Sequence, residues 1–276
     1  GQNVAMGKGS MGASTTGSNN TSIGYFAMFT NTTASNNTAV GYAALYDNTT
    51  GAGNTCVGES AGNNQTTADY NVCIGKNANE NGTTGHSNTA VGTNAGRNLS
   101  TGDNNLLLGF EAGITGSPGG NVNNENNHIC LGDENITEAH IQVDWTVASD
   151  ERDKTDFTDL DIGLDFVKQL APVTYKWDKR SNYIDKNDPD ADLDKVEHDG
   201  THKEDWLDIG FKAQEVEKIE ASAGYKIADK TNLTTTVTTD GKQYGIQYNK
   251  FVPILVKAIQ ELSAEVEELK SKLNEE

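Results

Sequence analysis

The sequence predicts a mainly β repeat stalk built from 17-residue rungs, followed by an α+β domain that ends in a coiled-coil helix. A short block ending in glycine returns every 17 residues through the first half of the 276-residue chain. Near Trp145 glycine and asparagine give way to charged and aromatic residues, and the last segment carries Leu, Ile and Val at heptad spacing. These features predict a stalk over 1–132, a neck over 133–148 and a second domain over 149–276, with the coiled-coil helix at 251–273.

The repeat is strict in its spacing, which is typical of architectures whose units stack on one another. An eighth block, HICLG, ends at Gly132, 23 residues after Gly109, so six extra residues lie in the loop around Ser117–Gly120. The seven regular blocks begin at Asn3, Asn20, Asn37, Asn54, Asn71, Asn88 and Asn105.

Each position of the rung has a physical interpretation. The residue before the glycine is aliphatic or Met in every block, and we expect it to face inward: Met6, Ile23, Val40, Val57, Ile74, Val91, Leu108 and Leu131. Three residues after the glycine stands an alanine, which predicts a site for a small side chain: Ala27, Ala44, Ala61, Ala78, Ala95 and Ala112. The glycine predicts a bend or a close backbone approach. The Asn/Thr/Gly runs between blocks predict turns, so each rung supplies one or two short strands and a turn.

One rung cannot be stable alone. Ordering 17 residues costs about 25 kcal/mol, whereas burying one aliphatic and a few small side chains returns far less. The stability of the stalk must therefore come from stacked rungs and from neighbouring chains.

The three cysteines are expected to be small buried thiols. Cys56, Cys73 and Cys130 share one phase of the repeat, which other blocks fill with Ala, Ser or Leu. Their odd number argues against a disulfide framework. Because no Cys-x-x-Cys or Cys/His pair is present, we expect no metal site and no cofactor.

The charge excludes several function classes. Net charge is −19, with −8 on residues 1–148 and −11 on residues 149–276. An acidic surface repels phosphate backbones, which disfavours nucleic-acid binding. No apolar run is long enough for a membrane span, so membrane insertion is not expected, and the N-terminus lacks the pattern of a signal peptide.

The second half carries four groups of motif residues. They are Ser149-Asp150 with Arg152 and Lys154; Leu164–Trp177; Gly210-Phe211 with Ala213-Gln214-Glu215-Val216; and Tyr248 leading into a helix with Ala258-Ile259-Gln260-Glu261-Leu262. Together these segments resemble the C-terminal intramolecular chaperone domain of phage endosialidases and many tail fibres, over 149–276. The repeat over 1–132 resembles the head repeats of trimeric autotransporter adhesins and phage fibre stalks, in which three chains wind a β-roll or β-prism.

The chaperone resemblance implies autoproteolysis by a Ser/Lys dyad, here Ser149 and Lys154. A neutral lysine can take the proton of a serine hydroxyl, and a nucleophile on the same chain as its target gains a large effective molarity. We expect a single-turnover serine peptidase that cuts its own chain at Ser149–Asp150, with Ala148–Ser149 as second choice. Three nearby carboxylates favour the charged amine, so the fold must direct them elsewhere, for example Asp150 toward Arg152. The alternative is that Ser149 caps a turn and Lys154 is a solvated surface residue.

The C-terminal helix is the predicted oligomerisation element. Its apolar residues alternate at spacings of four and three, as in the a/d seam of a coiled coil: Leu255, Ile259, Leu262, Val266, Leu269 and Leu273. The seam alone does not determine the number of chains, and the resemblance implies a homotrimer.

The combined features predict the C-terminal part of a phage tail fibre or tailspike, located in the virion and assembled in the host cytoplasm. In this hypothesis residues 149–276 bring three copies together, the stalk folds in register, and cleavage releases the chaperone. The alternative is a trimeric adhesin module that binds a host receptor or glycan and keeps a non-cleaving trimerisation domain. An ice-binding solenoid is less favoured, because the threonine column Thr21, Thr38, Thr55 and Thr89 is interrupted by apolar residues.

Two weaker signals lie in the acidic loop 185–199. Asp188, Asp190, Asp192 and Asp194 alternate, but they lack the glycine and terminal glutamate of an EF-hand loop, so a solvated acidic loop is favoured over calcium binding. His198 and His202 are four residues apart, and the intervening glycine argues against one helix presenting both to a metal.

Overall fold

The computed structural model describes residues 1–276 except 187, 189–190 and 276. The chain divides into two compact units. One comprises Gly1–Glu138 with Lys179–His198, and the other comprises Ala139–Asp178 with Asp199–Glu276. The predicted fold class is confirmed, since a parallel β-solenoid of 17-residue rungs precedes a mixed α/β region with a long final helix. Among the described residues, no helix is long and apolar enough to cross a membrane.

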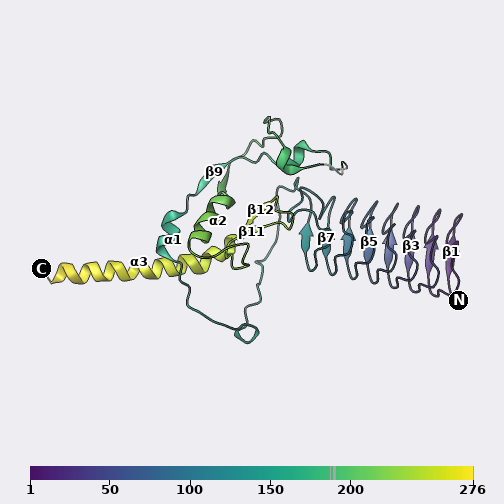
Figure 1. Ribbon diagram of the computed structural model, residues 1–276, viewed down its shortest axis with the longest axis horizontal. Coiled ribbons are helices and arrows are strands. Elements are labelled where there is room, and N and C mark those ends of the chain that lie inside the picture. The colour runs from purple at the N-terminus through teal and green to yellow at the C-terminus, as the bar shows by residue number, and fades with distance from the viewer. Residues whose placement is uncertain (187, 189–190, 276) are drawn as a thin grey trace. The chain divides into compact units, whose positions relative to one another are not determined.

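Within residues 1–138, all of them described, eight three-residue strands form one parallel sheet in sequential order. Figure 1 shows them as a row of arrows, one in each turn. Residues 17 apart pair in register, as in Thr38↔Thr55, and the step between the last two strands is 23 residues. The strands are β1 (Val4–Met6), β2 (Thr21–Ile23), β3 (Thr38–Val40), β4 (Thr55–Val57), β5 (Val72–Ile74), β6 (Thr89–Val91), β7 (Leu106–Leu108) and β8 (Ile129–Leu131).

The prediction that the residue before each glycine faces inward is wrong. These side chains lie on the outer face of the sheet, from half-buried to 63% exposed at Met6. Successive side chains of a strand point to opposite faces, so a three-residue strand directs its central residue inward and both neighbours outward. From the second rung on, the central residues are buried: Ser22, Ala39, Cys56, Cys73, Ala90, Leu107 and Cys130.

The other predictions for the rung are confirmed. The alanines three residues after the glycines are fully buried. Gly41 has φ +139, and a Cβ there would lie 2.3 Å from the carbonyl oxygen of Gly58 in the next rung, so two backbones approach closely. The cysteines are free and buried. A hydrogen bond with Cys73, together with burial, raises the pKa of Cys56 well above its usual value, which keeps it a thiol.

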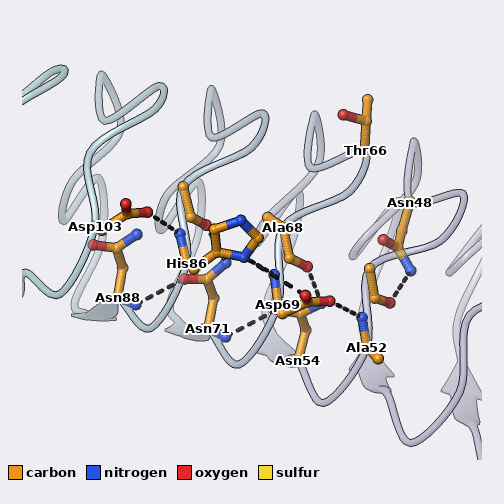
Figure 2. Close-up of polar contacts among 12 residues, drawn as sticks. Asn48, Ala52, Asn54, Thr66, Ala68, Asp69, Asn71, His86, Asn88 and Asp103 are labelled. Atoms are coloured by element: carbon orange, nitrogen blue, oxygen red, sulfur yellow. Dashed lines mark hydrogen bonds and ion pairs between the residues drawn. The ribbon is translucent and has the colours of Figure 1, made fainter.

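A ladder of buried asparagines, which the sequence did not predict, joins the rungs. The backbone N–H of Asn54 donates to Oδ1 of Asn37 (2.8 Å), and its side-chain Nδ2 donates to the carbonyl of Ala68 (2.7 Å). Asn71 repeats the pattern by donating its N–H to Oδ1 of Asn54 (2.9 Å), as Figure 2 shows. Each amide is satisfied inside the protein, because a buried unpaired polar group would be costly.

A second polar column lies on the outside of the same turns. The N–H of Ala52 donates to Asp69 (2.6 Å), that of Asp69 donates to Nδ1 of His86 (3.0 Å), and that of His86 donates to Asp103 (2.7 Å) (Figure 2). These side chains accept hydrogen bonds from backbone donors at the corner of each rung. Side chains of neighbouring rungs therefore accept the hydrogen bonds of backbone N–H groups in the turns of the solenoid.

The second unit contains three helices, two small two-stranded antiparallel sheets and one apolar core. Its core is formed by Ile162, Phe166, Val216, Phe251 and Ile254. The helices are α1 (Leu164–Gln169), α2 (Ala213–Ser222) and α3 (Phe251–Asn274). The antiparallel pairs are β9 (Val173–Tyr175) with β10 (Asp208–Gly210) and β11 (Thr235–Val237) with β12 (Tyr244–Ile246).

Short 3-10 turns complete the chain: η1 (Glu151–Asp153), η2 (Arg180–Tyr183), η3 (Leu193–Lys195) and η4 (Tyr248–Lys250). The helix expected over 251–273 is present as α3, which Figure 1 shows running to the C-terminus. Its Glu261 accepts a hydrogen bond from the N–H of Leu164 (2.7 Å), so a carboxylate satisfies the free N–H at the start of α1.

Candidate functional site

Ser149 and Lys154 lie in direct contact. Nζ of Lys154 is 2.6 Å from Oγ of Ser149 and 3.2 Å from the carbonyl oxygen of the same residue. The single turn η1 brings them together, because the N–H of Lys154 donates to the carbonyl of Glu151 (3.1 Å) and closes that turn. A separation of 2.6 Å suits transfer of a proton from a serine hydroxyl to an amine.

The carboxylate of Asp150 is directed away from the lysine, toward Arg152. Arg152 donates to it from Nε (3.0 Å) and Nη2 (2.6 Å), and also from its backbone N–H (2.9 Å). These hydrogen bonds hold the pKa of Asp150 below its usual value. The carboxylate also caps η1, so the capping residue of this turn is Asp150 and not Ser149.

The pair and its target bond are open to solvent in the single chain. Every residue from 135 to 159 is exposed. Burial favours the neutral form of a lysine amine and strengthens the electrostatic interactions of a site. The single chain therefore brings the two groups together but does not exclude water from them.

The neck carries an apolar pattern that the sequence analysis missed. Ile141, Val143, Trp145 and Val147 alternate with polar residues and are 51–74% exposed. Alternation with a period of two is typical of a half-buried strand. This period is the sequence signal that could have revealed the apolar face of the neck. The chain forms no strand there.

Helix α3 has one buried and one exposed apolar face. Phe251, Ile254 and Ala258 pack into the core of the second unit. The predicted seam lies outside this contact and is exposed along its whole length: Leu255, Ile259, Leu262, Val266, Leu269 and Leu273.

The remaining motif residues hold the second unit together. Gly210 leaves room for Tyr248, because a Cβ at Gly210 would lie 2.3 Å from the Tyr248 hydroxyl. That hydroxyl accepts the N–H of Phe211 (3.2 Å), and Val216 is buried in the core. Gly210, Phe211 and Tyr248 are therefore motif residues because they pack against one another.

The acidic loop is solvated only on part of its surface. Asp188 and Asp194 are exposed, Asp192 accepts the N–H of Asp194 at the start of η3, and Asp190 lies outside the described residues. Among the residues that the structure describes, no group of three His, Cys, Asp or Glu is arranged to hold a metal. His198 packs against the ring of Tyr183 (5.4 Å between centroids), and His202 is exposed.

Comparison with protein families matches residues 149–225 to the family described as Chaperone of endosialidase. The match begins at Ser149 and leaves the solenoid and residues 226–276 outside it. Comparisons with the curated proteins and with the solved structures find no match. Residues 149–225 therefore resemble a chaperone-of-endosialidase domain, and this segment follows a β-solenoid.

Proposed function

We propose that this chain is the C-terminal part of a phage tail fibre or tailspike. Residues 149–276 assemble three copies, support folding of the solenoid, and then cut the chain at Ser149–Asp150. The observation that carries this proposal is the 2.6 Å contact between Ser149 Oγ and Lys154 Nζ at the start of the matched domain. The match supports the proposed virion location, since such chaperones are typical of phage tail proteins.

In the proposed reaction neutral Lys154 accepts a proton within the dyad. The Ser149 hydroxyl cannot attack its own carbonyl carbon without closing a four-membered ring. Cleavage of Ser149–Asp150 therefore uses a water molecule activated by the dyad, or Oγ of a neighbouring copy. The attacking oxygen bonds to the Ser149 carbonyl carbon and its proton passes to Lys154; the Ser149–Asp150 C–N bond then breaks and the new amine of Asp150 takes that proton. Ser149 ends as a carboxylate, directly when water attacks, or after water hydrolyses the ester formed by Oγ of a neighbouring copy. The contact between Lys154 and the Ser149 carbonyl (3.2 Å) polarises the reacting group.

Attack by Ser149 Oγ on the preceding carbonyl would instead close a five-membered ring and lead to a cut at Ala148–Ser149. The two routes leave different termini, which intact mass distinguishes. The proposal commits to Ser149–Asp150, because Lys154 contacts the carbonyl oxygen on that side of the residue.

Assembly is supported by two apolar surfaces without a partner in the single chain. The α3 seam is spaced as a coiled coil, and the neck alternates as a strand. Parallel copies would cover both surfaces with one arrangement. The same association would place neighbouring chains beside the exposed dyad and exclude water from it.

A receptor-binding role for the solenoid is the second candidate. Tyr25 and Tyr42 are exposed and stacked, with ring centroids 5.6 Å apart and planes 5° apart. Flat aromatic surfaces of this kind suit the apolar faces of sugars. From the second block on, the asparagines at the block starts are buried in the ladder and are not available to a glycan. Glycan-array binding that is lost in Tyr42→Ala would support this role.

Denaturing intact mass on freshly expressed protein tests the proposed cleavage. Wild type is expected to give fragments 1–149 and 150–276, whereas Ser149→Ala and Lys154→Ala stay whole. Lys168→Ala is the matched control, because Lys168 is exposed and pairs only locally with Asp165 (3.4 Å). An uncut wild-type chain, or cleavage that persists in Lys154→Ala, would contradict the proposal.

A further inference from the structure

Part of the second half docks onto the end of the solenoid. We call residues 179–198 the acidic arm; they belong to the same compact unit as residues 1–138. Nζ of Lys186 lies 3.0 Å from Oε2 of Glu111 and also contacts Oε1 of Glu134. The three side chains are 12%, 12% and 6% exposed. A buried cation thus lies between two buried carboxylates.

Three further contacts surround this ion pair. Nη2 of Arg97 donates to the carbonyl of Lys186 (3.1 Å), and Nζ of Lys179 donates to the carbonyl of Glu134 (2.7 Å). Ser181 is buried against Gly116, where a Cβ would lie 2.5 Å from the serine Cβ. The arm therefore contacts residues that follow β6, β7 and β8, which are the last turns of the solenoid.

The contact of Lys186 with Glu111 and Glu134 forms only when the last turns of the solenoid are folded. Glu111 follows β7 and Glu134 follows β8, so both carboxylates reach one lysine only when these turns are stacked. Burial by itself lowers the pKa of Lys186, and the hydrogen bonds to Glu134 and Glu111 outweigh it, so the pKa lies above its usual value. The lysine is charged at neutral pH. Its removal would leave two buried carboxylates without their cation, which is strongly destabilising.

The acidic arm and the Glu111/Glu134 surface that it contacts lie on opposite sides of the proposed cut in the sequence. We propose that the acidic arm is a latch that holds the cut chaperone fragment on the completed end of the solenoid. Its partner is the Glu111/Glu134 surface of fragment 1–149. Cleavage then breaks the covalent link but does not by itself separate the fragments. This inference rests on the proposed cleavage at Ser149–Asp150.

Native size-exclusion chromatography of the cut protein tests the latch. Wild-type fragments 1–149 and 150–276 are expected to co-elute. Lys186→Ala is expected to weaken their association on the order of a hundredfold or more, so that they separate at micromolar concentration. Lys195→Ala is the matched control, since Lys195 is in the same arm and its side chain is 80% exposed. Wild-type fragments that separate unaided, or Lys186→Ala fragments that stay together, would overturn the latch.

Two measurements keep the outcome interpretable. Thermal unfolding of isolated fragment 150–276 by circular dichroism should give the same transition with Lys186→Ala as with Lys195→Ala, and the double variant Glu111→Gln/Glu134→Gln should also release the fragment. If wild type is not cut, the proposed cleavage fails while the latch remains testable. A site-specific protease sequence placed in the exposed segment 140–146 then creates equivalent fragments, and co-elution is measured in the same way.

Discussion

The two halves of the chain differ in whether their side chains find packing and hydrogen-bond partners within the same chain. In the solenoid, buried amides such as Asn54 and small residues such as Ala61 find their partners in the neighbouring rungs of the same chain. In the second half, large apolar side chains such as Trp145 and Leu273 are 74% exposed. A solenoid rung is completed by the next rung, whereas we propose that the neck and α3 are completed by other copies.

The largest effect is expected from breaking the asparagine ladder. Asn54→Leu leaves the N–H of Asn71 and the carbonyl of Ala68 buried without their partner. Two such groups cost about 2–6 kcal/mol of unfolding free energy. Urea unfolding of the solenoid measures this loss. Asn64→Leu is the control, because the hydrogen bond that its side-chain Nδ2 donates to Asn81 is exposed. An equal loss of unfolding free energy in both variants would show that the buried ladder has no special role.

The seam is the corresponding test for the second half. Leu262→Asp is expected to abolish the oligomer, because it places a charge in the centre of the proposed coiled-coil core. It should leave solenoid unfolding unchanged. Analytical ultracentrifugation measures the oligomer, with Ser271→Asp as the control on the face of α3 opposite the seam, where Ser271 is exposed. A Leu262→Asp protein with wild-type oligomeric state would contradict assembly through α3.

A smaller effect is expected at the contact between α3 and α1. Glu261→Gln removes the charge that accepts the N–H of Leu164, which should cost about 1 kcal/mol in the unfolding of the second unit. Glu267→Gln is the control, since Glu267 is exposed and pairs only with Lys270. Equal thermal midpoints in the two variants would mean that the cap contributes no stability.

The smallest predicted effect is a titration in the second unit. Burial, followed by the nearby charge of Asp208, raises the pKa of Tyr175 to about 12. A raised tyrosine pKa favours the protonated form in the folded state, so this contribution to stability is present below the ordinary pKa and is lost as pH rises from 10 toward 12. Ultraviolet titration of wild type against Tyr175→Phe should differ by one late-titrating tyrosine. Loss of an early-titrating one would contradict the assignment.

Much of the solenoid was predictable because its period is visible in single residues. Gly41, Ala61 and Cys56 each occupy a position where backbone approach or a narrow interior restricts side-chain size. The direction of the aliphatic residues was not predictable from their constancy. The central residue of each three-residue strand points inward, so its two neighbours, including Ile74, lie on the outer face.

The candidate site was predictable only where its residues are close in sequence. A single turn joins Ser149 to Lys154, and the arginine partner of Asp150 is two residues away. The contact of Lys186 with Glu111 spans 75 residues, and no local pattern indicates it. The predicted domain boundaries and the trimer stay predictions; the acidic arm groups with the solenoid in the structure.

The most direct test of the account is the native mass of the uncut Ser149→Ala chain at micromolar concentration. Native mass spectrometry, checked by light scattering, is expected to give three copies per particle, because neighbouring copies in the proposed homotrimer would cover the exposed seam and neck. A monomer under the same conditions would contradict the claim that the second half assembles the stalk.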